Sequence, residues 1–177
     1  MLETLRELDE GLLLLVQGMR ADWLNPLVEG YTSLGDAGMA WIVLSLVMLC
    51  WKPTRKAGVL ALAAMILGAV ITNVTLKPLV ARPRPWLDVE GLIPLIHVTD
   101  PDSFPSGHTC AAFAVGTIWA KTLPSGWMRV LAVVMELSMG FSRLYLGVHY
   151  PSDVLGGALV GTLCAFAAWK GYGALAK

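Results

Sequence analysis

Charged side chains are scarce in this sequence. Asp, Glu, Lys and Arg make up 15% of its 177 residues, whereas hydrophobic residues make up 56%. Soluble domains usually contain about a quarter charged residues, so the composition predicts a membrane protein. The formal net charge is zero, because thirteen basic residues balance thirteen acidic ones. A nucleic-acid partner, which a basic surface would indicate, is therefore not expected.

Cysteine is also rare, with Cys50, Cys110 and Cys164 all in apolar segments. Their spacing excludes a disulfide framework, and the nearby histidines do not complete a zinc site. The N-terminus lacks the basic start of a signal peptide, because its first ten residues are mostly acidic and leucine-rich. We therefore expect no cleavable signal, and insertion through internal apolar segments.

Runs with few or no charges recur along the chain and are candidate membrane-spanning helices. They cover residues 37–51, 57–76, 109–120, 130–141 and 154–169. The fold class we predict is all-α, an integral membrane helical bundle with five or six transmembrane helices. The basic turn at residues 52–56 favours the cytoplasmic side, so residue 77 would emerge on the outer side.

Residues 1–34 carry too many charges for an obvious span, and Pro26 interrupts them. We interpret them as helical pieces that lie on, or dip into, the membrane surface. The alternative is a sixth, imperfect spanning helix around residues 11–34.

A long outer loop over residues 77–105 contains six prolines, which exclude a continuous helix. It begins with Lys77, Arg82 and Arg84. Alternation of the spans places three polar stretches at the same outer face: 77–84, 106–108 and 143–153.

The last of these stretches, 143–153, contains side chains that are able to carry out phosphate chemistry. Charged residues beside membrane-length apolar runs usually line a polar cavity. Pro151 suits the first turn of a helix, which puts Asp153 about one turn in and His149 on the preceding loop. Asp153 could then hold one nitrogen of His149, while Arg143 binds phosphate oxygens. The alternative is a structural ion pair between Arg143 and Asp153, with His149 as an interfacial residue.

Three cations could neutralise a phosphoryl group: Lys77, Arg84 and Arg143. They would repel a divalent ion, so we expect no metal and no other cofactor. Ser106 and Gly107 stand where the next helix should begin, and the backbone N–H groups there can bind an anion.

Two histidines can divide the reaction between them. The spacing to Asp153 makes His149 the nucleophile, and His108 is then the acid that protonates the departing oxygen.

These residues form the pattern Lys77-x6-Arg84-Pro85, Pro105-Ser106-Gly107-His108 and Ser142-Arg143-x5-His149-x3-Asp153. The pattern resembles the three-part signature of the type 2 phosphatidic acid phosphatase superfamily and matches it at every signature position. The short chain also resembles the small bacterial members that act on lipid phosphates and polyprenyl diphosphates. The resemblance implies a bundle of about six membrane helices, with the site near the outer leaflet.

The resemblance further implies metal-independent hydrolysis through a phosphohistidine on His149, with His108 as leaving-group acid and Asp153 orienting the nucleophile. Phosphate binding is implied for five residues: Lys77, Arg84, Ser106, Gly107 and Arg143. Vanadate-binding haloperoxidases of the same superfamily use a similar anion pocket, but they are soluble.

We therefore predict a single multi-pass domain over residues 1–177, with the catalytic signature in 77–153 and the site on the extracytoplasmic side of the cell membrane. The expected partners are the membrane and a lipid phosphate, with undecaprenyl diphosphate as the first choice. Phosphatidylglycerophosphate or phosphatidic acid is the alternative substrate. A phosphotransferase using the same phosphohistidine and a non-catalytic lipid-binding protein are the rival functions. The oligomeric state is left open.

Other polar residues receive simpler interpretations. Arg82 either touches substrate or solvates the loop, and His97 is a loop residue. Glu136 is either functional or bonded to a neighbouring helix. Turn and cap duty is favoured over a metal loop for Asp88, Asp100 and Asp102. Gly157 and Gly161 have the spacing that lets helices pack closely within the bundle.

Overall fold

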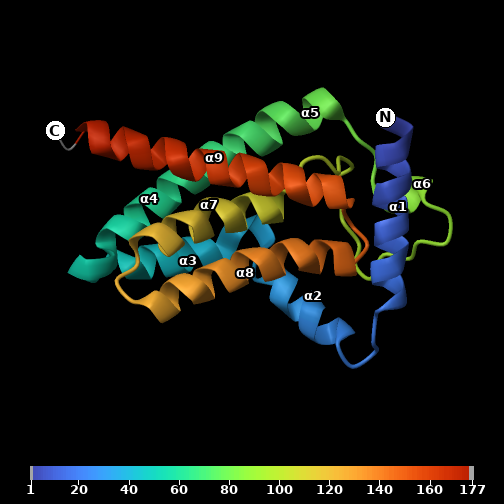
Figure 1. Ribbon diagram of the computed structural model, residues 1–177, viewed down its shortest axis with the longest axis horizontal. Coiled ribbons are helices and arrows are strands. Elements are labelled where there is room, and N and C mark those ends of the chain that lie inside the picture. Colours follow the sequence, from blue (N-terminus) through green and yellow to red (C-terminus); the bar gives the residue numbers. More distant parts are fainter. Residues whose placement is uncertain (1, 176–177) are drawn as a thin grey trace.

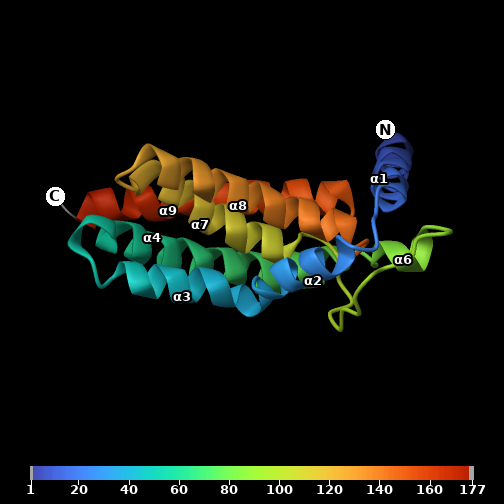
Figure 2. The same cartoon turned by 90° about the horizontal axis from the view of Figure 1, so that it is seen from below.

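The computed structural model describes residues 2–175, and every regular element in that range is a helix. The elements are α1 (Leu2–Gly18), α2 (Asn25–Ser33), the 3-10 helix η1 (Asp36–Gly38), α3 (Met39–Met48), α4 (Lys52–Ala69), the π-helix η2 (Val70–Leu76), α5 (Lys77–Val80), α6 (Pro85–Asp88), α7 (Gly107–Thr122), α8 (Gly126–Tyr145) and α9 (Pro151–Leu175). Helices α3, α4, α7, α8 and α9 run along the long axis, and α1 crosses one end of them (Figures 1 and 2). The all-α prediction is confirmed.

Helix α7 is the centre of the bundle and packs against α4, α8 and α9. Glycines on α9 permit the closest of these approaches. A Cβ on Gly161 would lie 2.4 Å from the Cys110 carbonyl oxygen, and one on Gly157 would lie 2.5 Å from the Ser106 carbonyl oxygen. The predicted role of both glycines in packing within the bundle is confirmed.

Two helix boundaries differ from those expected. The basic segment at residues 52–56 is the first turn of α4 rather than a turn between helices. Pro53 is compatible with this because the first helical residues need no intrahelical N–H bond. Helix α8 continues to Tyr145, so Arg143 lies in its last turn instead of beyond it.

The N-terminal region forms separate helices, as one of the two interpretations required. Non-helical backbone at residues 19–24 ends α1 before α2 begins, so one spanning helix over 11–34 does not form. Helix α1 buries Asp9, Leu13 and Val16 and exposes a stripe on its other side. That stripe contains Leu5, Leu8, Leu12 and Leu15.

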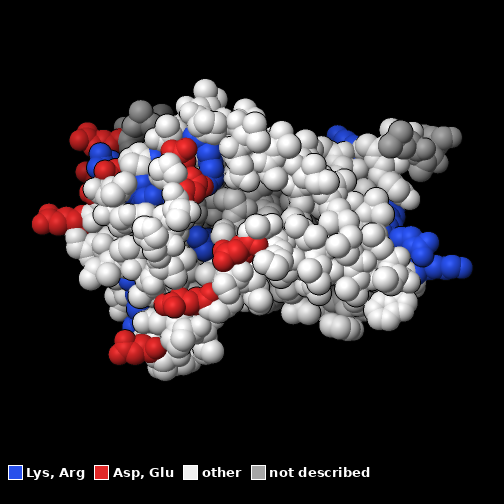
Figure 3. All heavy atoms as spheres, turned by 180° about the vertical axis from the view of Figure 1, so that it is seen from behind, with Lys and Arg blue, Asp and Glu red and all other residues white. Residues whose placement is uncertain are grey.

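Within the described residues, two helical stretches are long and apolar enough to cross a membrane: Lys52–Asp88 and Pro151–Ala174. A third is obtained if α2 and α3, with a 47° bend between them, count as one span. Acidic side chains gather at the end of the molecule where α1 lies, whereas the opposite end shows basic side chains (Figure 3). At that basic end Lys56 and Lys121 both lie over the ring of Trp169.

Candidate active site

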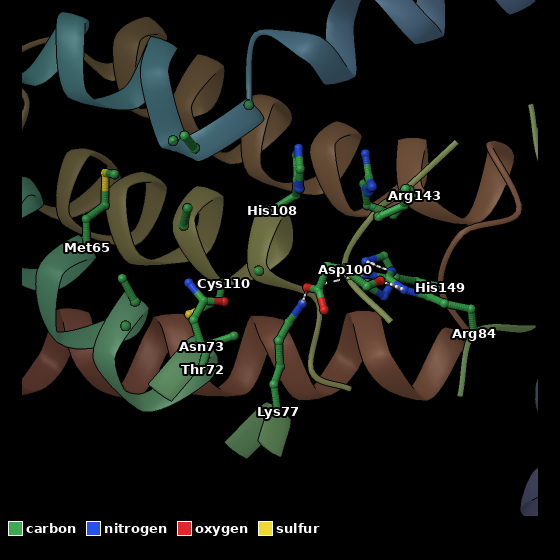
Figure 4. Close-up of a pocket in the computed structure, with 18 residues that line it drawn as sticks. Met65, Thr72, Asn73, Lys77, Arg84, Asp100, His108, Cys110, Arg143 and His149 are labelled. Carbon is green, nitrogen blue, oxygen red and sulfur yellow. Dashed lines mark hydrogen bonds and ion pairs between the residues drawn. The ribbon is translucent and has the colours of Figure 1, made fainter. Parts of the chain in front are cut away.

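A cavity of about 450 Å³ opens beside η1 and the start of α7 (Figure 4). Its walls also come from α4, η2, α8 and the loops around residues 84, 100 and 149. Six of the eight predicted site residues line it: Lys77, Arg84, Gly107, His108, Arg143 and His149. The other two, Ser106 and Asp153, are fully buried and are not part of the lining.

His149 lies on the loop between α8 and α9, and its side chain is almost completely buried. The Arg84 Nη1 atom lies 3.1 Å from His149 Nε2. Because a guanidinium can only donate hydrogen bonds, Nε2 must accept and therefore carries no proton. Burial, followed by the nearby charges of Arg143, Arg84 and Lys77, lowers the pKa of His149 well below its ordinary value of 6.5. The imidazole is thus neutral, with its unprotonated nitrogen turned toward Arg84.

Behind His149 stands Asp153, in the first turn of α9. Its Oδ2 atom lies 3.5 Å from His149 Nδ1 and accepts a hydrogen bond of 2.8 Å from the Tyr150 backbone N–H. Pro151 begins the helix, as expected, and this places the Asp153 carboxylate near Nδ1 of the ring. The carboxylate can therefore favour the tautomer that carries the proton on Nδ1.

Arg143 lines the cavity, and one of its buried donors has no hydrogen-bond partner among the described residues. Its Nη1 donates to Thr32 Oγ1 at 2.6 Å, which fixes the side chain, but the buried Nε has no partner among the described residues. A buried donor without a partner is costly, and an anion in the cavity would satisfy it. No sequence pattern pointed to Thr32, which lies on α2, far earlier in the chain.

Asp100 already contacts two of the cations. Its Oδ2 pairs with Lys77 Nζ and lies 3.5 Å from Arg84 Nη2 (Figure 4). Partial burial would raise the pKa of Asp100, but the hydrogen bonds from Lys77 and the Asp102 N–H, with the charges of Lys77 and Arg84, bring it below the ordinary value. The predicted turn role is confirmed by the Asp102 N–H bond of 3.0 Å. The contact of Asp100 with Lys77 and Arg84, the predicted phosphate-binding cations, was missed.

His108 has its own carboxylate partner, which sequence reasoning also missed. Its Nε2 lies 2.9 Å from Asp36 Oδ1, on the short helix η1. Ala37, next in the chain, has a φ of 51°, a conformation that is rare for residues other than glycine. Asp36 is 72 positions from His108 and belongs to no recognisable motif, so only the fold could bring the two together.

Ser106 caps α7, as predicted. Its side-chain oxygen accepts from the Thr109 backbone N–H at 3.4 Å and from Thr109 Oγ1 at 2.9 Å. Its own N–H donates to the Asp153 carbonyl at 3.0 Å. The following amides, of Gly107 and His108, begin the helix, where N–H groups have no carbonyl partner within the helix. This end of α7 can therefore receive an anion.

Arg82 neither lines the cavity nor solvates the loop. It donates to Asp153 on α9 and to Asp9 on α1. His97 is an exposed loop residue, as expected. Glu136 lies buried in α8 against Gly116, and its Oε2 has no hydrogen-bond partner among the described residues. Nor do the described residues contain a group of three or more His, Cys, Asp or Glu arranged to hold a metal ion.

The fold and the cavity define a helical protein with apolar spans in which two histidines and three cations line one cavity. Comparison with known families agrees, since the PAP2 superfamily matches residues 58–176. The chain belongs to the PAP2 superfamily and is a phosphatase that acts on lipid phosphates.

Individual relatives are named as phosphatases. An undecaprenyl-diphosphatase from Sulfolobus acidocaldarius is 31% identical over 71% of this chain, but the match spans only 60% of that protein. The solved structure of a PAP2-type phosphatidylglycerolphosphate phosphatase from Bacillus subtilis is 32% identical, with a TM-score of 0.79, and covers 98% of this chain and 88% of its own. Aquifex aeolicus LpxE is 26% identical, with a TM-score of 0.82, and covers 90% and 93%.

Proposed function

We propose that the protein removes a terminal phosphate from a membrane lipid, without a metal ion, through a phosphohistidine on His149. The observation that carries the proposal is the state of His149: a neutral imidazole, with its Nε2 free of a proton and its Nδ1 facing Asp153. A buried structural histidine would not need an unprotonated nitrogen directed at a cluster of cations.

In this mechanism the phosphate of the substrate takes the place of the Asp100 carboxylate between Lys77 and Arg84. The Arg143 Nε atom and the amides at the start of α7 bind the remaining oxygens. Positive charge fixed in advance around the phosphorus stabilises the charge of the transition state, the role that metal ions fill in other phosphoryl-transfer enzymes.

His149 Nε2 then attacks phosphorus, and the bond to the leaving oxygen breaks. His108 gives its proton to that oxygen, so the lipid leaves as a neutral hydroxyl or as a monophosphate. In the second step His108 removes a proton from water, which attacks the phosphohistidine and releases inorganic phosphate. Asp153 stabilises the positive imidazole ring throughout.

Undecaprenyl diphosphate is our first choice of substrate. The cavity is larger than one phosphate group needs, and it continues from His108 toward apolar residues on α4 and α7: Met65, Ala69, Cys110 and Ala111. The Sulfolobus relative, by its name, is an undecaprenyl-diphosphatase. The Bacillus subtilis structure favours phosphatidylglycerophosphate as the second candidate, because it matches nearly the whole of this chain.

For the membrane, we propose five or six spanning helices within one domain, with the site on the extracytoplasmic side. The basic starts of α4 and α8 and the basic ends of α7 and α9 support this orientation, because cytoplasmic ends of spans are enriched in Lys and Arg.

The deciding experiment measures phosphate release by the purified protein in detergent with EDTA present. Undecaprenyl diphosphate, phosphatidylglycerophosphate and phosphatidic acid are compared at equal concentrations. We expect release from all three in some degree and the fastest release from the diphosphate. Preference for a glycerolipid would replace the first choice, and loss of activity in EDTA that magnesium restores would overturn the metal-free mechanism. Transfer of phosphate to added alcohols in place of water would favour a phosphotransferase.

A further inference from the structure

Arg82 connects three parts of the chain behind the nucleophilic histidine. Its Nη1 donates to Asp153 Oδ1 and to Ser152 Oγ, both at 2.7 Å, and its Nη2 donates to Asp9 Oδ2 at 2.9 Å. The guanidinium also lies over the ring of Tyr150, 3.9 Å from its centre. A guanidinium has a planar fork of donors, so one arginine can bind two carboxylates in fixed directions.

The contact with Asp153 determines what that carboxylate can offer His149. Oδ1 is taken by Arg82, whereas Oδ2 accepts from the Tyr150 N–H and faces His149 Nδ1. With both oxygens held, the carboxylate cannot rotate away from the imidazole. The orientation of Asp153 that the mechanism requires therefore depends on Arg82, which does not line the substrate cavity.

Asp9 holds Arg82 from the other side. It is 2% exposed, although it belongs to α1, which crosses the end of the bundle. Its Oδ1 accepts from the Ser152 backbone N–H at 2.9 Å, and its Oδ2 accepts from the Ser152 hydroxyl as well as from Arg82. One carboxylate thus caps α9, the helix that carries Asp153, and fixes the arginine that orients Asp153.

Carboxylates outnumber cations in this cluster. A second cavity of about 270 Å³ lies here, apart from the substrate cavity. The titratable and charged groups around Arg82 are Arg6 and Asp9 of α1, Asp88 of α6, Tyr150 of the loop and Asp153 of α9. Asp9 and Asp153 are both buried, so without the guanidinium two carboxylates would remain with no cation between them. One of them would then readily take up a proton.

We propose that Arg82 and Asp9 are positioning residues for the nucleophile: Arg82 fixes the carboxylate of Asp153, and Asp9 of α1 fixes Arg82. This inference rests on the proposed function, because it assigns a role through His149. It gives α1 a part in catalysis, although α1 lies outside the residues matched by the family.

The test compares Arg82→Gln, Arg82→Lys and Asp9→Asn with the wild-type protein in detergent. Arg82→Gln should lower kcat by about 10- to 100-fold, the range found when residues that orient a reactive group are removed. Lysine can reach only one carboxylate, so Arg82→Lys should recover part of that loss. Asp9→Asn keeps an acceptor for Ser152 and should lose about 3- to 10-fold.

Two readouts separate positioning from a purely structural role. Inhibition by inorganic phosphate should stay within about threefold of wild type, because the substrate cations are unchanged. The acidic limb of kcat/KM should move to higher pH in Arg82→Gln, since the buried carboxylates then hold a proton more readily. His149, which responds to that proton, faces Lys77, Arg84, His108, Arg143 and Asp153.

Arg6→Gln is the matched control. It removes an arginine that lines the same second cavity but pairs with Glu10 on its own helix, so activity should be unchanged. If Arg82→Gln does not fold, as judged by its melting temperature and gel filtration, Asp9→Asn decides alone. Wild-type kcat and pH limb in Asp9→Asn and in any folded Arg82 variant would overturn the inference while leaving the proposed function intact. No phosphate release by the wild-type protein from any substrate would overturn both.

Discussion

The two histidines of the cavity differ in how deeply they and their carboxylate partners are buried. His149 is 3% exposed at its side chain and its partner Asp153 is completely buried, whereas His108 is 20% exposed and its partner Asp36 is 63% exposed. Asp153 is held by a backbone N–H and an arginine, while Asp36 lies on a short helix. The difference fits the two chemical tasks that we propose for these histidines. A nucleophile must meet phosphorus in one geometry, but an acid must reach leaving groups of different shapes.

Removal of the nucleophile should have the largest effect. His149→Ala should abolish turnover, a loss beyond about 10⁴-fold, because no other group can form the covalent intermediate. Binding of inorganic phosphate, measured by calorimetry, should persist through Lys77, Arg84 and Arg143. Residual turnover above the background of a mock preparation would remove His149 from this role.

Removal of the acid should cost less and should depend on the leaving group. His108→Gln should lower release from lipid phosphates by about 10²- to 10³-fold, the usual contribution of general acid catalysis. A nitrophenyl phosphate, whose leaving oxygen needs no proton, should lose much less when phosphohistidine formation is followed as a burst. Equal losses for both substrates would contradict the division of roles.

The comparison of the two carboxylates is sharpest in a matched pair of variants. Asp153→Asn should lower kcat by about 10²-fold, because the amide favours the wrong tautomer of a buried ring. Asp36→Asn should lose less than about 10-fold, since exposed charges are screened by solvent. Steady-state kcat values of the two variants, each with a matching melting temperature, decide the point. A larger loss of kcat in Asp36→Asn than in Asp153→Asn would reverse our ranking of the two carboxylates.

The smallest expected effect is that of pH. Because the pKa of His149 lies well below its ordinary value of 6.5, the ring gains its proton only at lower pH and is ready to attack above it. The acidic limb of kcat/KM, which reports the free enzyme, should therefore have its midpoint below pH 6.5. An aryl phosphate is the suitable substrate, because its own ionisation occurs at lower pH than that of an alkyl ester. A midpoint above pH 6.5 would mean that the resting imidazole is charged.

Sequence patterns predicted the local arrangement of the site residues better than the contacts that support them. Pro151, Asp153 and His149 lie within five positions, and local helix geometry was enough to place them. Asp36, Thr32 and Asp9 were missed because each reaches its partner only through tertiary packing. An isolated aspartate or threonine in a charged or turn-like segment carries no signal of its own.

The fold shows the same division. Runs with few or no charges identified the five helices that run along the long axis of the bundle: α3, α4, α7, α8 and α9. Helix ends were less predictable. Helix α8 includes Arg143, whose guanidinium donates to Thr32 of α2. The course of residues 1–34 was ambiguous because leucines and charges alternate there, a pattern that suits both a surface helix and an imperfect span.

Asp100 affects which lipid headgroups can bind at the proposed site. Its single negative charge pairs with Lys77 and Arg84, so a ligand must exchange with an internal anion. The headgroup of an ordinary phosphodiester lipid also carries one negative charge and gains little by that exchange, whereas a terminal phosphate carries up to two near neutral pH. Under the proposed function, this exchange favours a lipid with a terminal phosphate over the surrounding phosphodiester lipids. Phosphatidylglycerol should accordingly inhibit Asp100→Asn more than the wild-type protein, and equal inhibition would show that this selection arises elsewhere.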